Sequence, residues 1–518
     1  MSETTTAAAP AVARPGLGDP WVLGLSGGFI VAFLVFSLID LAQVQELVDT
    51  GHALAAEYLG SFWQLLLLAT FFTAIGVAVS PAGSAVMGDL DRPEMSTFRW
   101  VSIIMCTLLA GGGVFFAAGE PLYHFLETPP VFGVESATHD AVAPALAQSF
   151  MHWGFLAWAI LGALTSIVLM QAHYRYGKPL QPRTLLYPVF GERVMRNPWG
   201  GIVDAVCVIA VVAGTVGPIG FLATQVSFGA NTLFGLPEGF ATQFGVLIVL
   251  ALIYVTSAVT GIHRGIQVLS RFNVFLALGI GAFIFVFGPT LFLVNSYLQG
   301  FGTYLNDFLP MATVTSETAP DWWMQWWTVF FFAWFLGYGP LMAMFIARIS
   351  RGRTIRQMII ALAVAAPIAS TIWFTLLGGA GIHYQLTGAI DLAEPLADFQ
   401  FDVATLTVAQ ALPLGGLMAV LILVLTTIFV ATTGDSMSYT ISMVATGDQE
   451  PHTAVRAFWG VAMAVTAGVL LFMGEGGISA LQQFIVVTAV PVSLILLPSL
   501  YTGPKMAYAM AREQGIVR

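Results

Sequence analysis

The sequence predicts an all-α polytopic membrane protein, and three of its properties lead to that prediction. Only 9% of the 518 residues are charged and 57% are hydrophobic, whereas soluble domains carry about 25% charged residues. Apolar runs long enough to cross a bilayer, which takes roughly 20 residues, recur along almost the whole chain. The Lys and Arg residues fall between these runs in a pattern that places them all on one side of a membrane. Most of the chain must therefore face lipid or other helices.

Apolar runs between polar breaks give about twelve membrane-spanning helices. The expected spans are 20–40, 61–84, 100–119, 146–171, 201–229, 241–261, 273–296, 325–346, 358–379, 412–433, 456–473 and 481–500. Residues 1–19 are small, polar and proline-bearing, and they lack the basic start and apolar stretch of a signal peptide. We expect a disordered tail over 1–19, a transmembrane domain over 20–500 and a short tail over 501–518.

The basic residues also predict the orientation. With both termini in the cytoplasm, all 18 Lys and Arg residues lie in inner segments and none lies in an outer one. Positive residues resist translocation, so such a split is improbable if a span is missed or invented. The block from Arg348 to Arg356 would anchor the inner end of the eighth span. We therefore predict a multi-pass protein of the plasma or inner membrane with both termini cytoplasmic.

Two spans carry glycine or proline in their middle. The third contains "LLAGGGV", with Gly112 at its centre, and the eighth contains "WFLGYGP", with Gly337 and Pro340. Secondary transporters often bind substrate between helices that are interrupted at corresponding positions of two halves. We therefore predict that both helices unwind, with Gly112 and Gly337 in the wall of a binding site. The alternative is that these glycines only allow close helix packing.

The spacing of the two predicted breaks indicates an internal repeat. The third and eighth spans are five spans apart, so spans 3–7 and 8–12 would form two five-helix repeats. An odd number of helices inverts the second repeat in the membrane. The repeats would cover about 100–296 and 325–500, with the first two spans outside them.

Aromatic residues in the fourth and eighth spans are candidates for binding a cation. They are Trp153, Trp158, Trp334, Phe335 and Tyr338. An aromatic face attracts a desolvated cation by about 0.5–2 kcal/mol. Neither span contains an acidic residue, so a quaternary ammonium group would be held without a full counter-charge, which suits a net-neutral zwitterion. The alternative is that these Trp residues are interface anchors or packing residues.

Hydroxyl residues in the fifth and tenth spans are candidate sodium ligands. Thr215 lies in "VAGTVGP", and Thr432 and Thr433 are adjacent in "VATTGDSM". Sodium prefers oxygen ligands, although a buried Thr often bonds only to its own helix. We expect no cluster of metal ligands and no nucleophile–base pair within the spans, and therefore neither an enzyme nor a cofactor other than a coupling ion. Cys106 and Cys207 fall in apolar runs and are expected to be packing residues.

Four stretches together resemble the betaine/carnitine/choline transporter family. "MFIARISRGRTIRQ" at 344–357 is very similar to the family signature, "HWGFLAWAI" at 152–160 resembles its fourth span, "GIVDAVCVIAVVAGTVGPIG" at 201–220 its fifth, and "TTGDSMSYT" at 432–440 its tenth. The resemblance implies twelve helices in a LeuT-like inverted repeat, commonly assembled as a homotrimer. It also implies uptake of trimethylammonium solutes such as glycine betaine, choline or carnitine, often driven by sodium.

The resemblance places the family's aromatic box and its sodium ligands on the candidates named above, with several departures. Leu161 stands where the family usually has Tyr, and Phe335 and Tyr338 stand where it has Trp. Val211 and Pro218 replace hydroxyl residues of sodium-coupled members, so one sodium site looks intact and the other impaired. A sulfonium or sulfonate analogue therefore remains an alternative substrate.

The prediction for function is a secondary transporter that imports a compact zwitterionic or quaternary-ammonium solute by alternating access, coupled to sodium. Its partners would be this solute, sodium and the lipid bilayer, with no nucleic acid. One rival is a sodium-independent exchanger of two related solutes. A rival of another class is a membrane sensor that binds the solute without transporting it.

Overall fold

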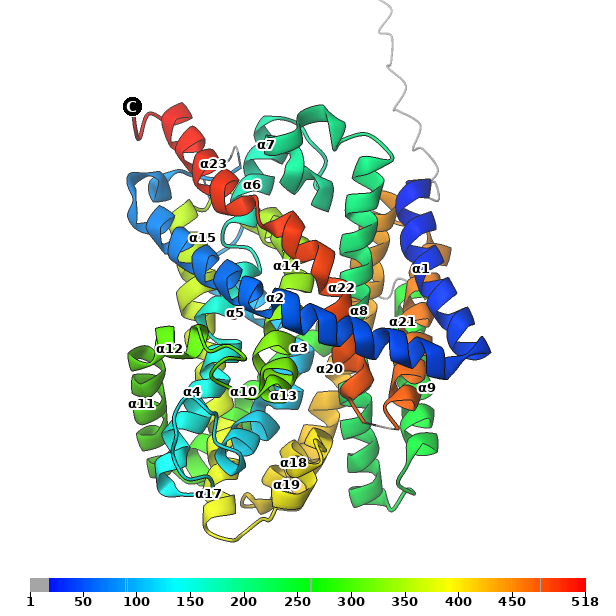
Figure 1. Cartoon of the computed structure of the whole chain (residues 1–518), viewed down its shortest axis with the longest axis vertical. Coiled ribbons are helices and arrows are strands. Elements are labelled where there is room, and N and C mark those ends of the chain that lie inside the picture. The colour runs from blue at the N-terminus through cyan, green and yellow to red at the C-terminus, as the bar shows by residue number, and fades with distance from the viewer. Residues whose placement is uncertain (1–17, 89, 91, 261–262, 449, 476) are drawn as a thin grey trace, which may run out of the picture.

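The computed structural model describes residues 18–88, 90, 92–260, 263–448, 450–475 and 477–518, so most of the tail expected over 1–19 lies outside the described residues. Within these ranges the regular secondary structure consists of helices and a single isolated bridge between Val86 and Thr354. Among the described residues, eleven helical segments are long and apolar enough to cross a membrane. Figure 1 shows how the helices are arranged in the bundle. The prediction of an all-α polytopic membrane protein is confirmed.

Each predicted span corresponds to a helical segment. The eleven segments contain α1 (Pro20–Ile39), α2 (Leu41–Val79), α4 to α6 (within His139–Arg175), α8 (Trp199–Phe234), α9 (Phe240–Thr260), α10 (His263–Phe287), α13 and α14 (within Asp321–Ile349), α15 to α17 (within Ile355–Leu386), α20 (Gly415–Thr446), α21 (Thr453–Met473) and α22 (Ser479–Leu496). The predicted third span corresponds to α3 (Thr97–Leu126), a further helix of 30 residues.

Some boundaries differ from the predicted ones. The 39 residues of α2 make a helix about 58 Å long, which exceeds the thickness of a hydrocarbon core of about 30 Å. Figure 1 shows α2 running obliquely across the bundle. The predicted span 273–296 is divided between α10 and a separate helix, α11 (Thr290–Asn306). Pro289 lies between them and disfavours a helical conformation for Gly288, the residue before it.

Three spans form the centre of the bundle. In the segment containing α4 to α6, 94% of the most apolar window is buried, and the values for α8 and for Asp321–Ile349 are 89% and 83%. The windows of α9 and α10 are only 22% buried, and their exposed side chains include Leu252 and Phe275. The outer helices thus present apolar side chains to the surroundings, as lipid-facing helices do.

The predicted unwinding of the third and eighth spans is wrong. Both α3 and α14 (Phe330–Ile349) run continuously through their glycines, and α14 also contains Pro340. A glycine lowers helix stability by about 1 kcal/mol, whereas each backbone group left unbonded in lipid costs several. The glycines allow close packing instead: an added Cβ would lie 2.6 Å from Pro218 Cβ at Gly111 and 2.9 Å from Leu496 Cδ1 at Gly339.

A broken helix does occur, but in the fourth span. α4 (Val142–Trp153) ends at Gly154, and α5 (Phe155–Ile160) and α6 (Thr165–Met170) follow. Gly154 has φ −103° and ψ −137°, and a Cβ there would lie 2.1 Å from the carbonyl oxygen of Phe150. The N–H of Phe155, released by the break, donates to the hydroxyl of Tyr304 at 3.0 Å. The break lies directly after Trp153.

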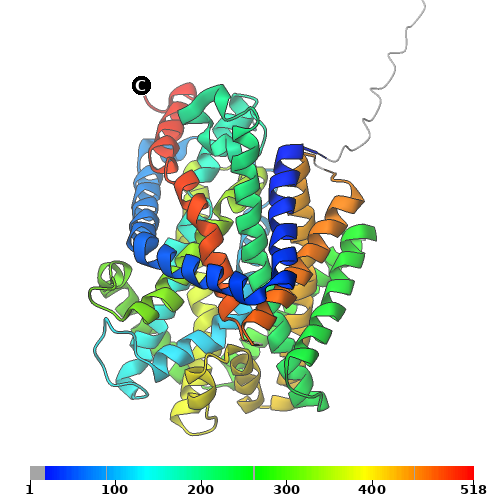
Figure 2. The ribbon, with the colours of Figure 1, turned by 45° about the vertical axis from the view of Figure 1, so that its right-hand side comes forward.

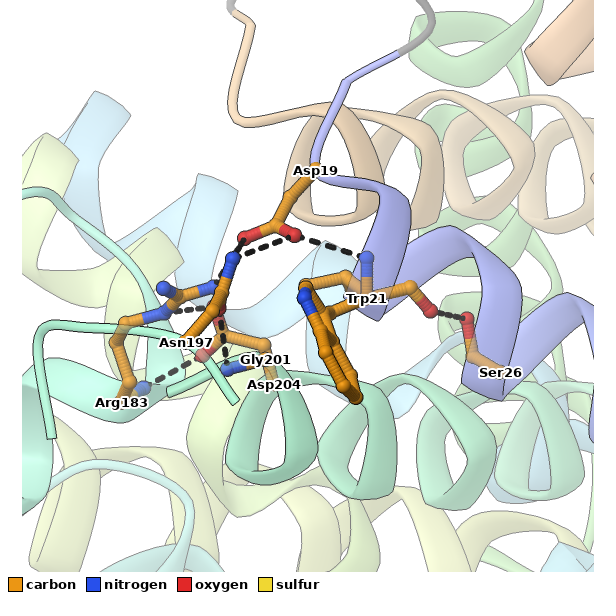
Figure 3. A network of polar contacts seen from close by, with 8 residues as sticks. Asp19, Trp21, Ser26, Arg183, Asn197, Gly201 and Asp204 are labelled. Carbon is orange, nitrogen blue, oxygen red and sulfur yellow. Dashed lines mark hydrogen bonds and ion pairs between the residues drawn. The ribbon is translucent and has the colours of Figure 1, made fainter. Parts of the chain in front are cut away.

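A buried ion-pair network attaches the first helix to the central bundle (Figure 3). The Arg183 side chain donates from Nε to Asp204 Oδ2 at 2.6 Å and from Nη2 to Asp19 Oδ2 at 3.0 Å. Burial raises the pKa of Asp19, but hydrogen bonds from Arg183 and Asn197 outweigh it and hold the pKa below its ordinary value. Asp19 also caps α1, which packs beside α8 (Figure 2).

Replacing Asp204 by Asn is expected to destabilise the protein by about 3 kcal/mol, because the nearly buried Arg183 would lose the fully buried one of its two charged partners and keep only Asp19. The matched control is Glu513→Gln, which breaks the pair with Arg175. Those side chains are 38% and 59% exposed, so the cost should stay below about 1 kcal/mol. Thermal unfolding of the purified variants in detergent measures both effects. Equal losses in the two variants would contradict the assignment of the network as structural.

Candidate functional site

A cavity of about 220 Å³ lies at the centre of the bundle, between α3, α4, α8, α10, α14 and α20. Its aromatic lining residues are Trp153, Trp334, Phe335, Tyr338 and Phe429, and its polar ones include Ser270, Asn273, Thr432, Thr433 and Ser436. No charged side chain lines it within the described part of the chain. Such a cavity suits a ligand without net charge, or a cation held by aromatic faces.

Trp153 and Trp334 form the centre of the lining. Their ring centroids are 5.9 Å apart and the planes meet at 80°, while Trp153 and Phe335 are 5.5 Å apart at 87°. The indole N–H of Trp334 donates to the carbonyl oxygen of Gly214 at 3.1 Å. That of Trp153 donates to Glu120 Oε2 at 2.7 Å. These bonds fix the orientation of both indoles.

Gly112 allows these two rings to approach α3. A Cβ at this position would lie 2.2 Å from Trp334 Cη2 and 2.9 Å from Trp153 Cη2. Real Cβ atoms do not make contacts this short, and both neighbours are rigid rings held by hydrogen bonds. Gly112 therefore belongs to the cavity wall, although its helix is continuous.

The candidate sodium ligands occupy two different environments. The Thr215 hydroxyl donates to the carbonyl oxygen of Val211 at 2.8 Å and lies 3.1 Å from the hydroxyl of Tyr338, which therefore donates to it. Thr432 donates to the carbonyl oxygen of Ile428 in its own helix at 2.9 Å. Thr432 and Thr433 line the cavity, whereas Thr215 reaches it only through Tyr338. Their role as sodium ligands stays a prediction.

Two predicted site residues lie away from the cavity. Trp158 is buried and its indole N–H donates to Ser370 Oγ at 2.9 Å. Gly337 faces Ala210 and Ala489, and a Cβ there would meet them at ordinary distances of 3.7–3.8 Å. Substrate contacts for these two residues remain predictions that the observed positions do not favour.

Asn273 is a lining residue that the sequence reasoning missed. Its side chain is 2% exposed, and neither amide atom has a hydrogen-bond partner among the described residues. Buried polar groups are nearly always bonded, so this amide is suited to a polar ligand group. Ser270 lies one turn earlier and also lines the cavity. The available signal was Asn273 at the start of the apolar seventh span, with Ser270 just before it.

The cavity extends toward one end of the bundle. We call this the basic end, because the segment 175–196, which contains four Arg residues and one Lys, lies there. This segment includes α7 (Tyr187–Phe190) and is at the top of Figure 1. The lining residues Met342 and Ser436 follow the central rings toward this end. On the other side, the ring centroid of Phe116 lies 5.1 Å from that of Phe331 and 5.8 Å from that of Phe401. Packed rings therefore close the cavity on the side away from the basic end.

A group of possible metal ligands lies at the edge of the predicted spans, whereas the sequence led us to expect none within them. Glu120, His124 and His152 come together beside Trp153, and all three are completely buried. Glu120 and His124 lie on α3, beyond the predicted end of the third span, and His152 lies on α4. The sequence could not show the cluster, because 32 residues separate Glu120 from His152.

A membrane-spanning helix bundle around an uncharged aromatic cavity is typical of transporters of small solutes. The family model described as BCCT, betaine/carnitine/choline family transporter, matches residues 21–512. The chain belongs to this family, as the sequence resemblance indicated. It is a transporter of the BCCT type and not an enzyme.

Relatives with assigned names agree with this membership. "Glycine betaine transporter 2" of Vibrio parahaemolyticus is 48% identical over 496 residues, which are 96% of this chain and 91% of the relative. "Glycine betaine transporter OpuD" of Bacillus subtilis is 30% identical, covering 90% of each chain. "Ectoine/hydroxyectoine transporter" of Virgibacillus pantothenticus is also 30% identical, covering 90% of this chain and 93% of the relative.

Proposed function

We propose that this protein imports glycine betaine by alternating access and couples the uptake to sodium. The observation that carries the proposal is the uncharged cavity in which the indoles of Trp153 and Trp334 meet nearly at right angles. A trimethylammonium group fits such a corner because it presents positive charge without N–H donors that need partners. The names of two relatives, at 48% and 30% identity, support the same substrate.

The polar part of the lining would receive the carboxylate of the solute. The Asn273 amide has no other partner among the described residues, and an N–H···carboxylate bond is stronger than one between neutral groups. The Ser270 hydroxyl lies on the same side of α10 and could add a second donor. A zwitterion would thus meet aromatic faces at one end and uncharged donors at the other.

The closure of the cavity supports alternating access. The cavity extends toward the basic end, and closely packed rings around Phe116 fill the opposite side. If the basic end is cytoplasmic, as positive residues favour, this arrangement corresponds to an inward-facing state. We propose a plasma-membrane location with both termini cytoplasmic, a LeuT-like pair of inverted repeats and a homotrimer, as the family resemblance implies.

Uptake into proteoliposomes tests substrate and coupling together. Labelled glycine betaine, choline, carnitine, dimethylsulfoniopropionate, taurine and ectoine would be offered with and without a sodium gradient. Two relatives are named for ectoine transport, so ectoine is the second candidate. Counterflow without sodium would instead favour the exchanger, and saturable binding without uptake would favour the sensor. Failure of every one of these solutes to enter would refute the proposed function.

Sodium dependence should change when the two adjacent hydroxyls are removed. In Thr432→Val/Thr433→Val, half-maximal uptake is expected to need at least about tenfold more sodium, equivalent to about 1.4 kcal/mol of lost ion binding. The control is Thr427→Val on the same helix, whose hydroxyl donates to the carbonyl oxygen of Leu423 and lies outside the cavity lining. An unchanged sodium dependence in the double variant would rule out a sodium site at this pair.

A further inference from the structure

A compact group of titratable side chains lies behind the ring of Trp153, on the side away from the cavity. His152 Nδ1 is 2.7 Å and His124 Nε2 is 3.7 Å from the same oxygen, Glu120 Oε1. One ligand atom from each of the three residues lies within 4.8 Å of the others. All three side chains are fully buried between α3, α4 and the segment that precedes α14.

The charges and hydrogen bonds of this group are incomplete. Both ring nitrogens of His124 lack a hydrogen-bond partner among the described residues, although buried polar groups are nearly always bonded. The only ion-pair partners of Glu120 in the described part of the chain are His124 and His152. A buried carboxyl group is stable when it carries a proton or when a positive charge lies beside it. The group therefore offers imidazole lone pairs and a carboxyl oxygen that has no Lys or Arg partner among the described residues.

A second layer of polar groups holds two of these residues from behind. Glu120 Oε2 accepts the indole N–H of Trp153 at 2.7 Å. His152 Nε2 lies 3.0 Å from the Gln148 amide and 3.3 Å from Thr328 Oγ1. Because the amide nitrogen and oxygen of Gln148 are interchangeable in assignment, its oxygen can accept the His152 Nε2–H. The Nδ1 lone pair of His152 then faces Glu120, as in metal sites where the outer nitrogen is hydrogen-bonded.

We propose that Glu120, His124 and His152 form a binding site for a divalent transition-metal ion of the zinc class. Two imidazoles and a carboxylate are a typical zinc ligand set, with bonds of about 2.0–2.2 Å. An ion between Glu120 Oε1 and His124 Nε2, which are 3.7 Å apart, reaches both at these lengths. A proton shared by Glu120 and His152 would satisfy only that pair and would leave both His124 nitrogens unbonded.

The site has a direct connection to transport through one carboxylate. Glu120 would hold the ion with Oε1 and the indole of Trp153 with Oε2. Trp153 lines the cavity, and His152 precedes it at the end of α4. A bound ion would thus tie α3 to α4 next to the break at Gly154, and its binding is expected to change the rate of solute uptake.

The test uses the purified full-length protein in detergent, without any transported solute, so that its result does not depend on the proposed function. Zn²⁺ is the first probe, and wild type is expected to retain roughly one ion per chain after gel filtration. Excess Zn²⁺ should raise the Tm by at least about 2 °C. Co²⁺ is the second probe and should give the visible absorption bands of a four-coordinate ion with nitrogen ligands.

The variant His124→Phe keeps a ring against Trp327, whose centroid is 4.4 Å away, and removes both unbonded nitrogens. It should lose the retained Zn²⁺ and the Tm shift. The exposed His139 provides the control, because His139→Ala should keep both. Retention in His124→Phe, or loss in His139→Ala, would overturn the proposal. If His124→Phe does not fold, the wild-type Co²⁺ spectrum decides, and its absence overturns the proposal as well.

Discussion

Gly112→Ala is expected to lower the initial rate of glycine betaine uptake by roughly 10- to 100-fold. The new Cβ would lie 2.2 Å from Trp334 and 2.9 Å from Trp153, so one or both indoles must move. Overpacking of this kind typically costs 1–3 kcal/mol, and about 1.4 kcal/mol corresponds to a factor of ten. The measurement is labelled uptake into proteoliposomes, normalised to the amount of inserted protein.

Gly337→Ala is the matched control, because the sequence assigned both glycines the same role. A Cβ at Gly337 would meet its neighbours at 3.7–3.8 Å, and alanine is a better helix former than glycine by about 1 kcal/mol. Uptake should therefore remain near wild type and thermal stability should not fall. Equal loss of transport in both variants would mean that helix flexibility, rather than space for the rings, is what the glycines provide.

Trp334→Ala is expected to abolish measurable uptake and to raise the Kd for glycine betaine. The ring provides up to about 2 kcal/mol of cation–π attraction, which corresponds to a Kd about 30 times higher. Its removal also leaves a cavity beside Phe330 and Phe116, at a stability cost of about 3–5 kcal/mol. Equilibrium binding of labelled glycine betaine and thermal unfolding measure the two effects separately.

Two further variants separate binding from packing. Trp334→Phe keeps an aromatic face and loses the hydrogen bond to Gly214, so it should bind more weakly than wild type but better than the alanine variant. Trp158→Phe loses the bond to Ser370 and part of a buried ring, but residue 158 lies away from the cavity, so the Kd should not change. A normal Kd in Trp334→Ala, or a weakened one in Trp158→Phe, would contradict the aromatic site as the structure places it.

Much of the protein could be predicted from local composition. The spans, the helical class and the family follow from runs of apolar residues and from motifs such as "MFIARISRGRTIRQ". These features depend on a single helix at a time, because a bilayer demands a sufficient length of apolar chain and satisfied backbone groups. The sequence could also name Trp153, Trp334, Phe335 and Tyr338 as candidates, because each lies within a single span, and all four line the cavity.

Contacts between helices had to come from the folded chain. Gly112 was selected because glycine can interrupt a helix, yet its importance lies in the space that two indoles from α4 and α14 require. The break at Gly154 depends on the Tyr304 hydroxyl, which lies 149 residues from its partner Phe155. The unpartnered state of Asn273 in the cavity lining, and the grouping of Glu120 with two histidines, became visible only when distant helices were placed together.

The amino-acid order alone was sufficient for the class of protein, its spans and its aromatic candidates, since each of these is written in one stretch of chain. The tertiary structure decided which rings meet, which helix breaks and which polar groups remain without partners. Those properties depend on side-chain contacts between helices, and the same glycine or histidine can serve packing or binding according to what its neighbours leave beside it.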